Sequence, residues 1–172
     1  TRGLQIAQRY GWRQNQAQAL ILYGQAQMSL QLLAAAATSY QQALALCQEL
    51  QDAYLGAEAQ AALAQLALQQ GDLPQAQALV AAILPVLARH PQAGLDEPFA
   101  IYFTCYRVLA AAADPHADAI LQQGYALLQQ YASQIFDDTL RRSFLENVAV
   151  HRALQQAALK GLGNEQNTTY RS

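Results

Sequence analysis

The chain has 172 residues and a formal net charge of −2, and Ala, Gln and Leu together make up just over half of it. These are good helix formers, whereas the β-branched residues that strands prefer amount to about a tenth of the chain, so the composition excludes folds rich in β-sheet and predicts an all-α protein. The balanced charge also argues against nucleic-acid binding, which usually needs a strongly basic surface.

The first predicted elements lie within residues 1–50. Residues 1–10 are expected to end one helix, and Gly11 and Trp12 to form a turn before two further helices, over 17–30 and 34–50. A large aromatic residue in such a turn either covers the N-terminal edge of the fold or contacts a preceding repeat. We favour the second interpretation, which predicts an exposed apolar surface near Trp12.

The next two helices are predicted over 57–70 and 75–89, with a short turn between them. Gly71 suits the C-terminus of the first helix, because glycine readily adopts the left-handed conformation. Asp72 can cap the second helix, and Pro74 falls in its first turn, where the missing N–H has no cost. A loop over residues 90–98 follows.

Three more helices are predicted, over 99–113, 116–136 and 139–160. Asp114 is placed to cap the second of them, and either Asp137 or Asp138 can cap the third. Glycines at 161 and 163 are expected to end the helical pattern, so that residues 161–172 form a polar tail.

A repeat with a period of about 40 residues organises these helices. Each unit has a small residue, a second small residue twelve positions on, a bulky residue four later and a small or apolar residue three later. These structural positions are Gly24, Ala36, Tyr40 and Ala43; Ala64, Ala76, Val80 and Ile83; and Cys105, Ala117, Leu121 and Gly124. We expect the small residues where paired helices cross, because small side chains let helix axes approach closely. The repeats cover 17–50, 57–89 and 98–136, before a terminal helix over 138–160.

This pattern resembles the tetratricopeptide repeat (TPR), whose helix pairs carry residues of these sizes at these spacings. The period exceeds the usual length of about 34 residues and is similar to that of the C-terminal arrays of large bacterial signalling ATPases and transcription regulators. The resemblance implies an α-α superhelix of about three helix pairs plus a terminal helix over residues 1–160. Residues 1–10 would then end a preceding repeat, so the chain is expected to be the C-terminal piece of a longer protein.

The resemblance implies a non-catalytic, cytoplasmic module for protein–protein interaction, serving as the sensor or scaffold arm of its parent protein and contacting the parent's upstream domains. In the family, the first helices of the pairs line a concave groove that binds partners. The matching positions are Gln18, Ile21, Gln25 and Met28; Glu58, Ala61, Gln65 and Gln69; and Phe99, Tyr102 and Tyr106. Tyr102 and Tyr106 are the candidate anchors, since aromatic residues are enriched among binding hot spots. The alternative is that these aromatic residues pack against the last helix pair.

Two other functions stay open, a scaffold that homo-oligomerises through its helical edges and a sensor that binds an apolar ligand between Met28, Tyr102 and Tyr106. The sequence predicts no catalytic residue, metal site, cofactor, direct nucleic-acid contact or membrane partner. The two cysteines fit buried core positions, and the histidines are isolated from one another. The longest apolar run, over 78–88, is too short to span a bilayer.

Overall fold

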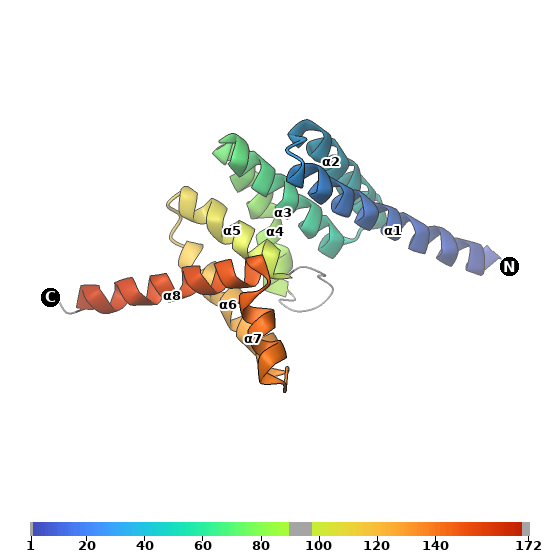
Figure 1. Cartoon of the computed structure of the whole chain (residues 1–172). Coiled ribbons are helices and arrows are strands. Elements are labelled where there is room, and N and C mark those ends of the chain that lie inside the picture. The colour runs from blue at the N-terminus through green and yellow to red at the C-terminus, as the bar shows by residue number, and fades with distance from the viewer. Residues whose placement is uncertain (1, 90–97, 170–172) are drawn as a thin grey trace. The chain divides into compact units, whose positions relative to one another are not determined.

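The computed structural model describes residues 2–89 and 98–169, and the side chains of 11–89 and 98–160. Within these ranges the chain forms eight α-helices and no strand (Figure 1), which confirms the predicted all-α class and a repeat-like succession of helices. The chain divides into two units, Thr1–Asp96 and Glu97–Ser172, and each is described by itself. Among the described helices, none is both long enough and apolar enough to cross a membrane.

The first unit contains four helices that pack in chain order: α1 (Arg2–Ser29), α2 (Leu33–Leu50), α3 (Ala53–Gln70) and α4 (Leu73–Arg89). Each helix packs against the next, and α1 also contacts α3. Only two or three residues join consecutive helices, so neighbours run antiparallel. Figure 1 shows that the N-terminal part of α1 extends past α2, which is ten residues shorter.

The turns of the first unit share one backbone design. Gln31, Gln51 and Gly71 follow the three helix ends in the left-handed conformation, with φ of 60°, 56° and 80°. In the later two turns an aspartate comes next, and the carboxylates of Asp52 and Asp72 each accept a hydrogen bond of 3.0 Å from the backbone N–H three residues on. The predicted helix end at Gly71 and the predicted cap at Asp72 are therefore confirmed, and Asp52 is a further cap of the same kind.

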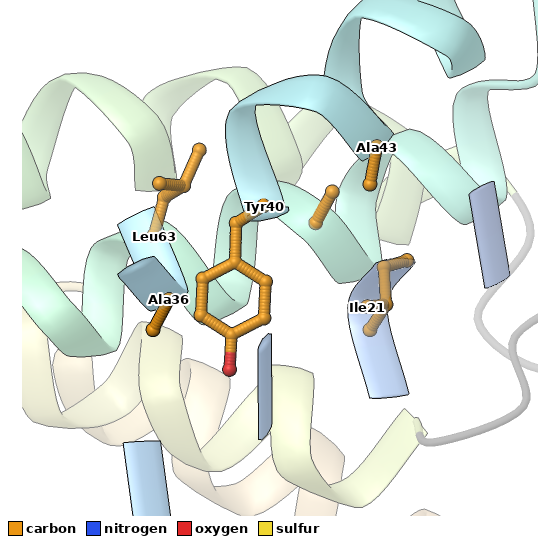
Figure 2. Packing of buried hydrophobic residues seen from close by; sticks show 6 residues of the cluster. Ile21, Ala36, Tyr40, Ala43 and Leu63 are labelled. Carbon is orange, nitrogen blue, oxygen red and sulfur yellow. The ribbon is translucent and has the colours of Figure 1, made fainter. Parts of the chain in front are cut away.

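The core of the first unit joins α1, α2 and α3 around the ring of Tyr40. Figure 2 shows this ring lying between Leu63 and Ile21. The ring also covers Gly24, where a Cβ atom would overlap it at less than 3.0 Å. Burial raises the pKa of the Tyr40 hydroxyl to about 12. These contacts hold α1 and α2 close together, because only glycine leaves room for the aromatic ring.

The second unit also contains four helices: α5 (Pro98–Ala111), α6 (Ala117–Ser133), α7 (Asp138–Glu146) and α8 (Ala149–Thr169). Helix α5 packs against α6 and α8, α6 also contacts α7 and α8, and α7 contacts α8. Tyr102, Leu128 and Leu154 are buried in this core. A Cβ atom at Gly124 would lie 2.7 Å from the Cβ of Tyr102, so glycine again sets how closely two helices approach.

All twelve structural positions of the predicted repeat are buried. The sequence register therefore identified core positions in both units. The neighbours differ in detail from the prediction, since the atoms nearest to a Cβ at Gly24 belong to Tyr40, and those nearest to one at Gly124 belong to Tyr102 and Leu154. In both cases the glycine accommodates a bulky side chain of the neighbouring helices.

The N-terminus differs from the prediction. Residues 2–29 form the single helix α1, so residues 2–10 are not the end of a separate helix, and Gly11 and Trp12 lie within a helix rather than in a turn. Glycine costs about 1 kcal/mol relative to alanine inside a helix, which the good helix formers on both sides can offset. A single glycine was therefore too weak a signal for a turn.

The predicted terminal helix over 139–160 is instead two helices, because α7 ends at Glu146 and α8 begins at Ala149. Helix α8 then continues to Thr169, so the glycines at 161 and 163 do not end it, and residues 161–169 are helical rather than an irregular tail. Residues 170–172 of the expected tail lie outside the described part of the chain. Asp137 is the N-cap of α7, and its carboxylate accepts the N–H groups of two following residues at 2.8 and 2.9 Å.

Side chains of α8 compensate the break between α7 and α8. A helix end leaves carbonyl groups without partners. The Nδ1 atom of His151 lies 2.8 Å from the carbonyl oxygen of Phe144 and donates to it, because a carbonyl can only accept. The guanidinium of Arg152 donates to the carbonyl oxygen of Glu146 at 3.0 Å. Two of the freed acceptors are thereby satisfied.

Candidate interaction surface

Helix α1 carries apolar side chains on two opposite faces. Ala17, Ile21 and Gly24 are buried on the side that packs against the rest of the first unit. The second set is exposed, and we call it the outer face of α1: Trp12, Ala19, Leu22, Tyr23, Ala26 and Leu30. Helical spacing aligns these residues in one stripe along the helix.

Four large apolar side chains dominate the outer face. Trp12 is 75% exposed, Leu22 55%, Tyr23 60% and Leu30 70%. Leu30 follows the last residue of α1, and its N–H still donates to the carbonyl oxygen of Ala26 at 3.1 Å, so the stripe keeps its helical path. Single exposed apolar residues are ordinary, whereas contiguous apolar patches are typical of interaction surfaces.

All residues of the outer face except Trp12 lie in a long stretch of chain without charged residues. Residues 14–48 include no Asp, Glu, Lys, Arg or His. An ion pair between Arg13 and Glu49 lies at the boundary of this stretch and links α1 to α2. A neutral apolar surface loses little hydration energy when it is covered, which favours association.

The repeat shows what covers the equivalent face elsewhere in the chain. The residues 40 positions after Ala19 and Tyr23 are Ala59 and Leu63 on α3. Both are buried in the core cluster that α3 forms with α1 and α2, and Ala62, the equivalent of Leu22, packs against that cluster. The face that α3 buries against its neighbours is therefore exposed on α1.

The groove positions predicted from the repeat differ widely in exposure. Gln25, Gln65 and Gln69 are exposed; Gln18, Met28 and Tyr106 are half-buried; and Ile21, Glu58, Ala61, Phe99 and Tyr102 are buried. Tyr102, one of the two predicted anchors, is only 1% exposed. It therefore offers no accessible ring to a protein partner or to a small apolar ligand.

Phe99 belongs to an aromatic cluster inside the second unit. Its ring centroid lies 5.4 Å from that of Tyr131, 6.1 Å from Phe144 and 4.6 Å from His151, with near-perpendicular ring planes. Such edge-to-face contacts stabilise a core. The structure thus shows the alternative interpretation for Phe99, which packs against the last two helices. The roles of Phe144 and His151 were not predicted, and their spacing of seven residues was the available signal.

Cys47 borders a small hollow of about 270 Å³ between α2, α3 and α4. Burial, with smaller contributions from the carboxylates of Asp52 and Glu58, raises the pKa of its thiol to about 11. Burial raises the pKa of the Cys105 thiol to about 12. Both thiols are protonated at neutral pH, and a protonated thiol is a poor nucleophile and a poor metal ligand.

The described side chains contain no group of three or more His, Cys, Asp or Glu residues that could hold a metal ion. The N-cap of α6 is His116 and makes no side-chain capping hydrogen bond, so the prediction that this helix is capped by Asp114 is wrong. The carboxylate of Asp114 instead accepts the backbone N–H of His116 at 2.8 Å and lies 2.8 Å from the ring Nδ1 of the same residue. The hydrogen bonds from His116 hold the pKa of Asp114 below its usual range.

Comparisons with protein-family models, with curated proteins and with solved structures found no match to this chain. The tetratricopeptide resemblance therefore stays a prediction that rests on the repeat register. The surface that stands out on physical grounds is the outer face of α1.

Proposed function

We propose that this chain is a protein-interaction module and that its contact surface is the outer face of α1. The observation that supports the proposal is the exposure of Trp12, Leu22, Tyr23 and Leu30 along one side of a single helix. Covering one large apolar side chain is worth roughly 1.5–3 kcal/mol. Because the four side chains are 55–75% exposed, a protein that covered the stripe would gain part of that amount from each of them, less the cost of association.

The repeat register supports a finer proposal. The module would be the cytoplasmic sensor or scaffold arm of a larger bacterial signalling or transcription-regulatory protein, in contact with the parent's upstream domains. Such an arm regulates by binding more tightly to one state of its target than to another, because only differential affinity shifts a conformational equilibrium. The arm itself would be non-catalytic.

The proposed contact surface differs from the concave groove expected from the sequence. The predicted groove anchor Tyr102 is buried, and Phe99 is held by three other rings. The aromatic side chains that a partner can reach in the first unit include Trp12 and Tyr23, both on α1. Hot spots are enriched in Trp and Tyr, so these two residues are the proposed anchors.

A site-specific photo-crosslinker tests the proposal in cells that make the protein. We expect a crosslinker in place of Tyr23 to form an adduct with a protein, and the adduct to disappear when Trp12→Gln and Leu30→Gln are added. The matched control is the same crosslinker in place of Phe136, which is 96% exposed but lies in the second unit. Equal adducts at both positions, or none at Tyr23, would contradict the proposal.

A further inference from the structure

We propose that the outer face of α1 binds the same face of a second copy of this chain, with the two α1 helices antiparallel around a two-fold axis. This inference rests on the proposed function, because it names the partner of the surface assigned there. Three properties of the face support a second copy as the occupant.

The first property is the absence of charge. Partners of unlike sequence usually recognise each other through complementary charges, which also exclude wrong partners. The stretch from Gln14 to Gln48 offers no charge for such recognition. Two copies of a neutral face can meet without the like-charge repulsion that opposes most self-association. An uncharged apolar face is therefore a chemically suitable partner for an identical face on a second copy.

The second property is the order of large and small side chains along α1. If Trp12 lies opposite Leu30 of the second copy in an antiparallel pair, then Ala19 lies opposite Tyr23 of that copy. At Ala19 and Tyr23 a small side chain then meets a large one, which lets facing helices interdigitate, whereas Trp12 and Leu30 are both large and meet at each end of the contact. The same register applies in both directions, as a two-fold axis requires.

The third property is the example that α2 and α3 provide. On α3, the residues equivalent to Ala19 and Tyr23 are buried in the cluster formed with α1 and α2, and α2 precedes α3 as its antiparallel neighbour. An antiparallel α1 from a second copy would cover the outer face of the first in the same manner. Each α1 would then be covered on both of its apolar faces.

The size of the face predicts a weak, closed dimer. A large aromatic side chain buries roughly 150–250 Å² when it is covered. The four large exposed side chains of two copies would therefore remove on the order of 1,000 Å² from water, which is at the lower limit for a specific interface. We expect association in the micromolar range that stops at two copies, because the same patch is used on both sides.

Sedimentation equilibrium of the purified chain over about two decades of concentration around the micromolar range tests the dimer. We expect a monomer–dimer equilibrium that changes little with salt, because no charged pair is placed at the contact. Tyr23→Gln and Leu22→Gln should each weaken association about tenfold or more. The matched controls Phe136→Gln and Leu159→Gln, exposed apolar residues of the second unit, should leave it unchanged. A monomer at every concentration, or equal effects of all four variants, would overturn the proposal.

Disulfide trapping tests the antiparallel register with little change to the face. Gln16 and Ala26 are exposed and lie at corresponding levels in the proposed pair, whereas two copies of either residue are separated by about 15 Å along the helices. Mild oxidation of a mixture of Gln16→Cys and Ala26→Cys chains should trap a mixed dimer, while each variant alone should not. The native cysteines are buried and do not compete. A disulfide between two copies of one variant would overturn the antiparallel arrangement.

The two proposals fail in different ways. If the purified chain stays monomeric but the crosslinker at Tyr23 captures another protein in cells, the second copy is the wrong occupant and the interaction function stands. If the crosslinker captures nothing, the interaction function fails. Circular dichroism of each variant verifies its helical content, so that loss of association is not mistaken for loss of folding.

Discussion

Two glycines show how a single residue sets the distance between helices. Gly24 faces the ring of Tyr40, and Gly124 faces the Cβ of Tyr102, so an added methyl group would overlap a buried neighbour in each unit. Gly11 is also helical, but an added Cβ there would have no atom within 4 Å. The same residue type therefore has opposite energetic consequences at different positions of one chain.

We expect Gly24→Ala and Gly124→Ala to lower the free energy of unfolding by about 1–3 kcal/mol, because each overfills a packed contact. Gly11→Ala should raise it by up to about 1 kcal/mol, since alanine is the better helix former and meets no neighbour. Urea unfolding followed by circular dichroism measures all three. A destabilising Gly11→Ala, or a neutral Gly124→Ala, would contradict the assigned packing.

Stability should also fall at alkaline pH through buried groups of the first unit. Burial raises the pKa of the Cys47 thiol from 9.0 to about 11, so the folded state holds its proton more tightly than the unfolded state does. The resulting stabilisation is complete below pH 9 and is lost as the pH rises towards 11. We expect the free energy of unfolding to decrease from pH 8.5 to 10.5, and the decrease to be smaller in Cys47→Ala.

In that experiment, the slope of the unfolding free energy against pH distinguishes the titration of Cys47 from its contribution to packing. Cys47→Ala also removes a buried sulfur and lowers stability at every pH, so only the pH dependence is informative. Tyr40, whose pKa is raised to about 12, continues to titrate in the variant. Identical slopes in the two proteins would show that Cys47 does not contribute.

Among the helices, the break between α7 and α8 is compensated by the side chain of His151. Its Nδ1–H donates a hydrogen bond to the carbonyl oxygen of Phe144. The centroid of its ring lies 4.4 Å from the ring centroid of Phe144 and 4.6 Å from that of Phe99. One side chain thus compensates a helix end and joins three helices. This role could not be recognised from an isolated histidine in the sequence.

We expect His151→Phe to lower the free energy of unfolding by about 1–3 kcal/mol, because the aromatic ring is kept while a carbonyl acceptor loses its partner. Gln156→Ala, an exposed position on the same helix, is the control and should be close to neutral. Chemical unfolding of both variants provides the measurement. Equal stabilities would mean that water replaces the lost hydrogen bond at no cost.

The sequence predicted those elements whose signals are local. The end of α3 and the start of α4 follow from Gly71 and Asp72, which act within a few residues of their own positions. The continuity of α1 was missed, because a helical glycine is disfavoured only slightly and the outcome depends on the whole helix. The burial of Tyr102 was only one of two alternatives, since Gly124, which makes room for its side chain, is far away in the sequence.

The candidate site was predicted in part. An exposed apolar surface near Trp12 was expected, and Trp12 is exposed, although within a helix rather than a turn. Leu22 and Tyr23 were not identified, because α1 is apolar on two faces and the pattern alone does not say which one the fold covers. Only the arrangement of neighbouring helices decides that question.

At the scale of the whole molecule, each of the two units has a core of its own. Tyr40 and its neighbours fill the first, while Tyr102, Leu128 and Leu154 fill the second. Units with separate cores can open separately. Local stability is therefore expected to differ between α1–α4 and α5–α8.

We expect Leu154→Ala, which removes a completely buried side chain, to destabilise the second unit by about 2–5 kcal/mol. Amide hydrogen exchange should accelerate in α5, α6 and α8 and stay unchanged in α2 and α3. Mass spectrometry of peptides from the exchanged protein gives the measurement. Faster exchange throughout α2 and α3 would show that the two units unfold as one.

The scarcity of Lys and Arg in the first unit determines what proteolysis can reveal about its stability. Neither Lys nor Arg occurs between Arg13 and Arg89, so trypsin has no cleavage site within α2 or α3 whether these helices are folded or not. Survival of this region in a tryptic digest is therefore no sign of stability. A protease that cuts after aromatic and leucine residues finds Tyr23 and Leu30 exposed, and slower cleavage there would reveal any molecule that covers the outer face of α1.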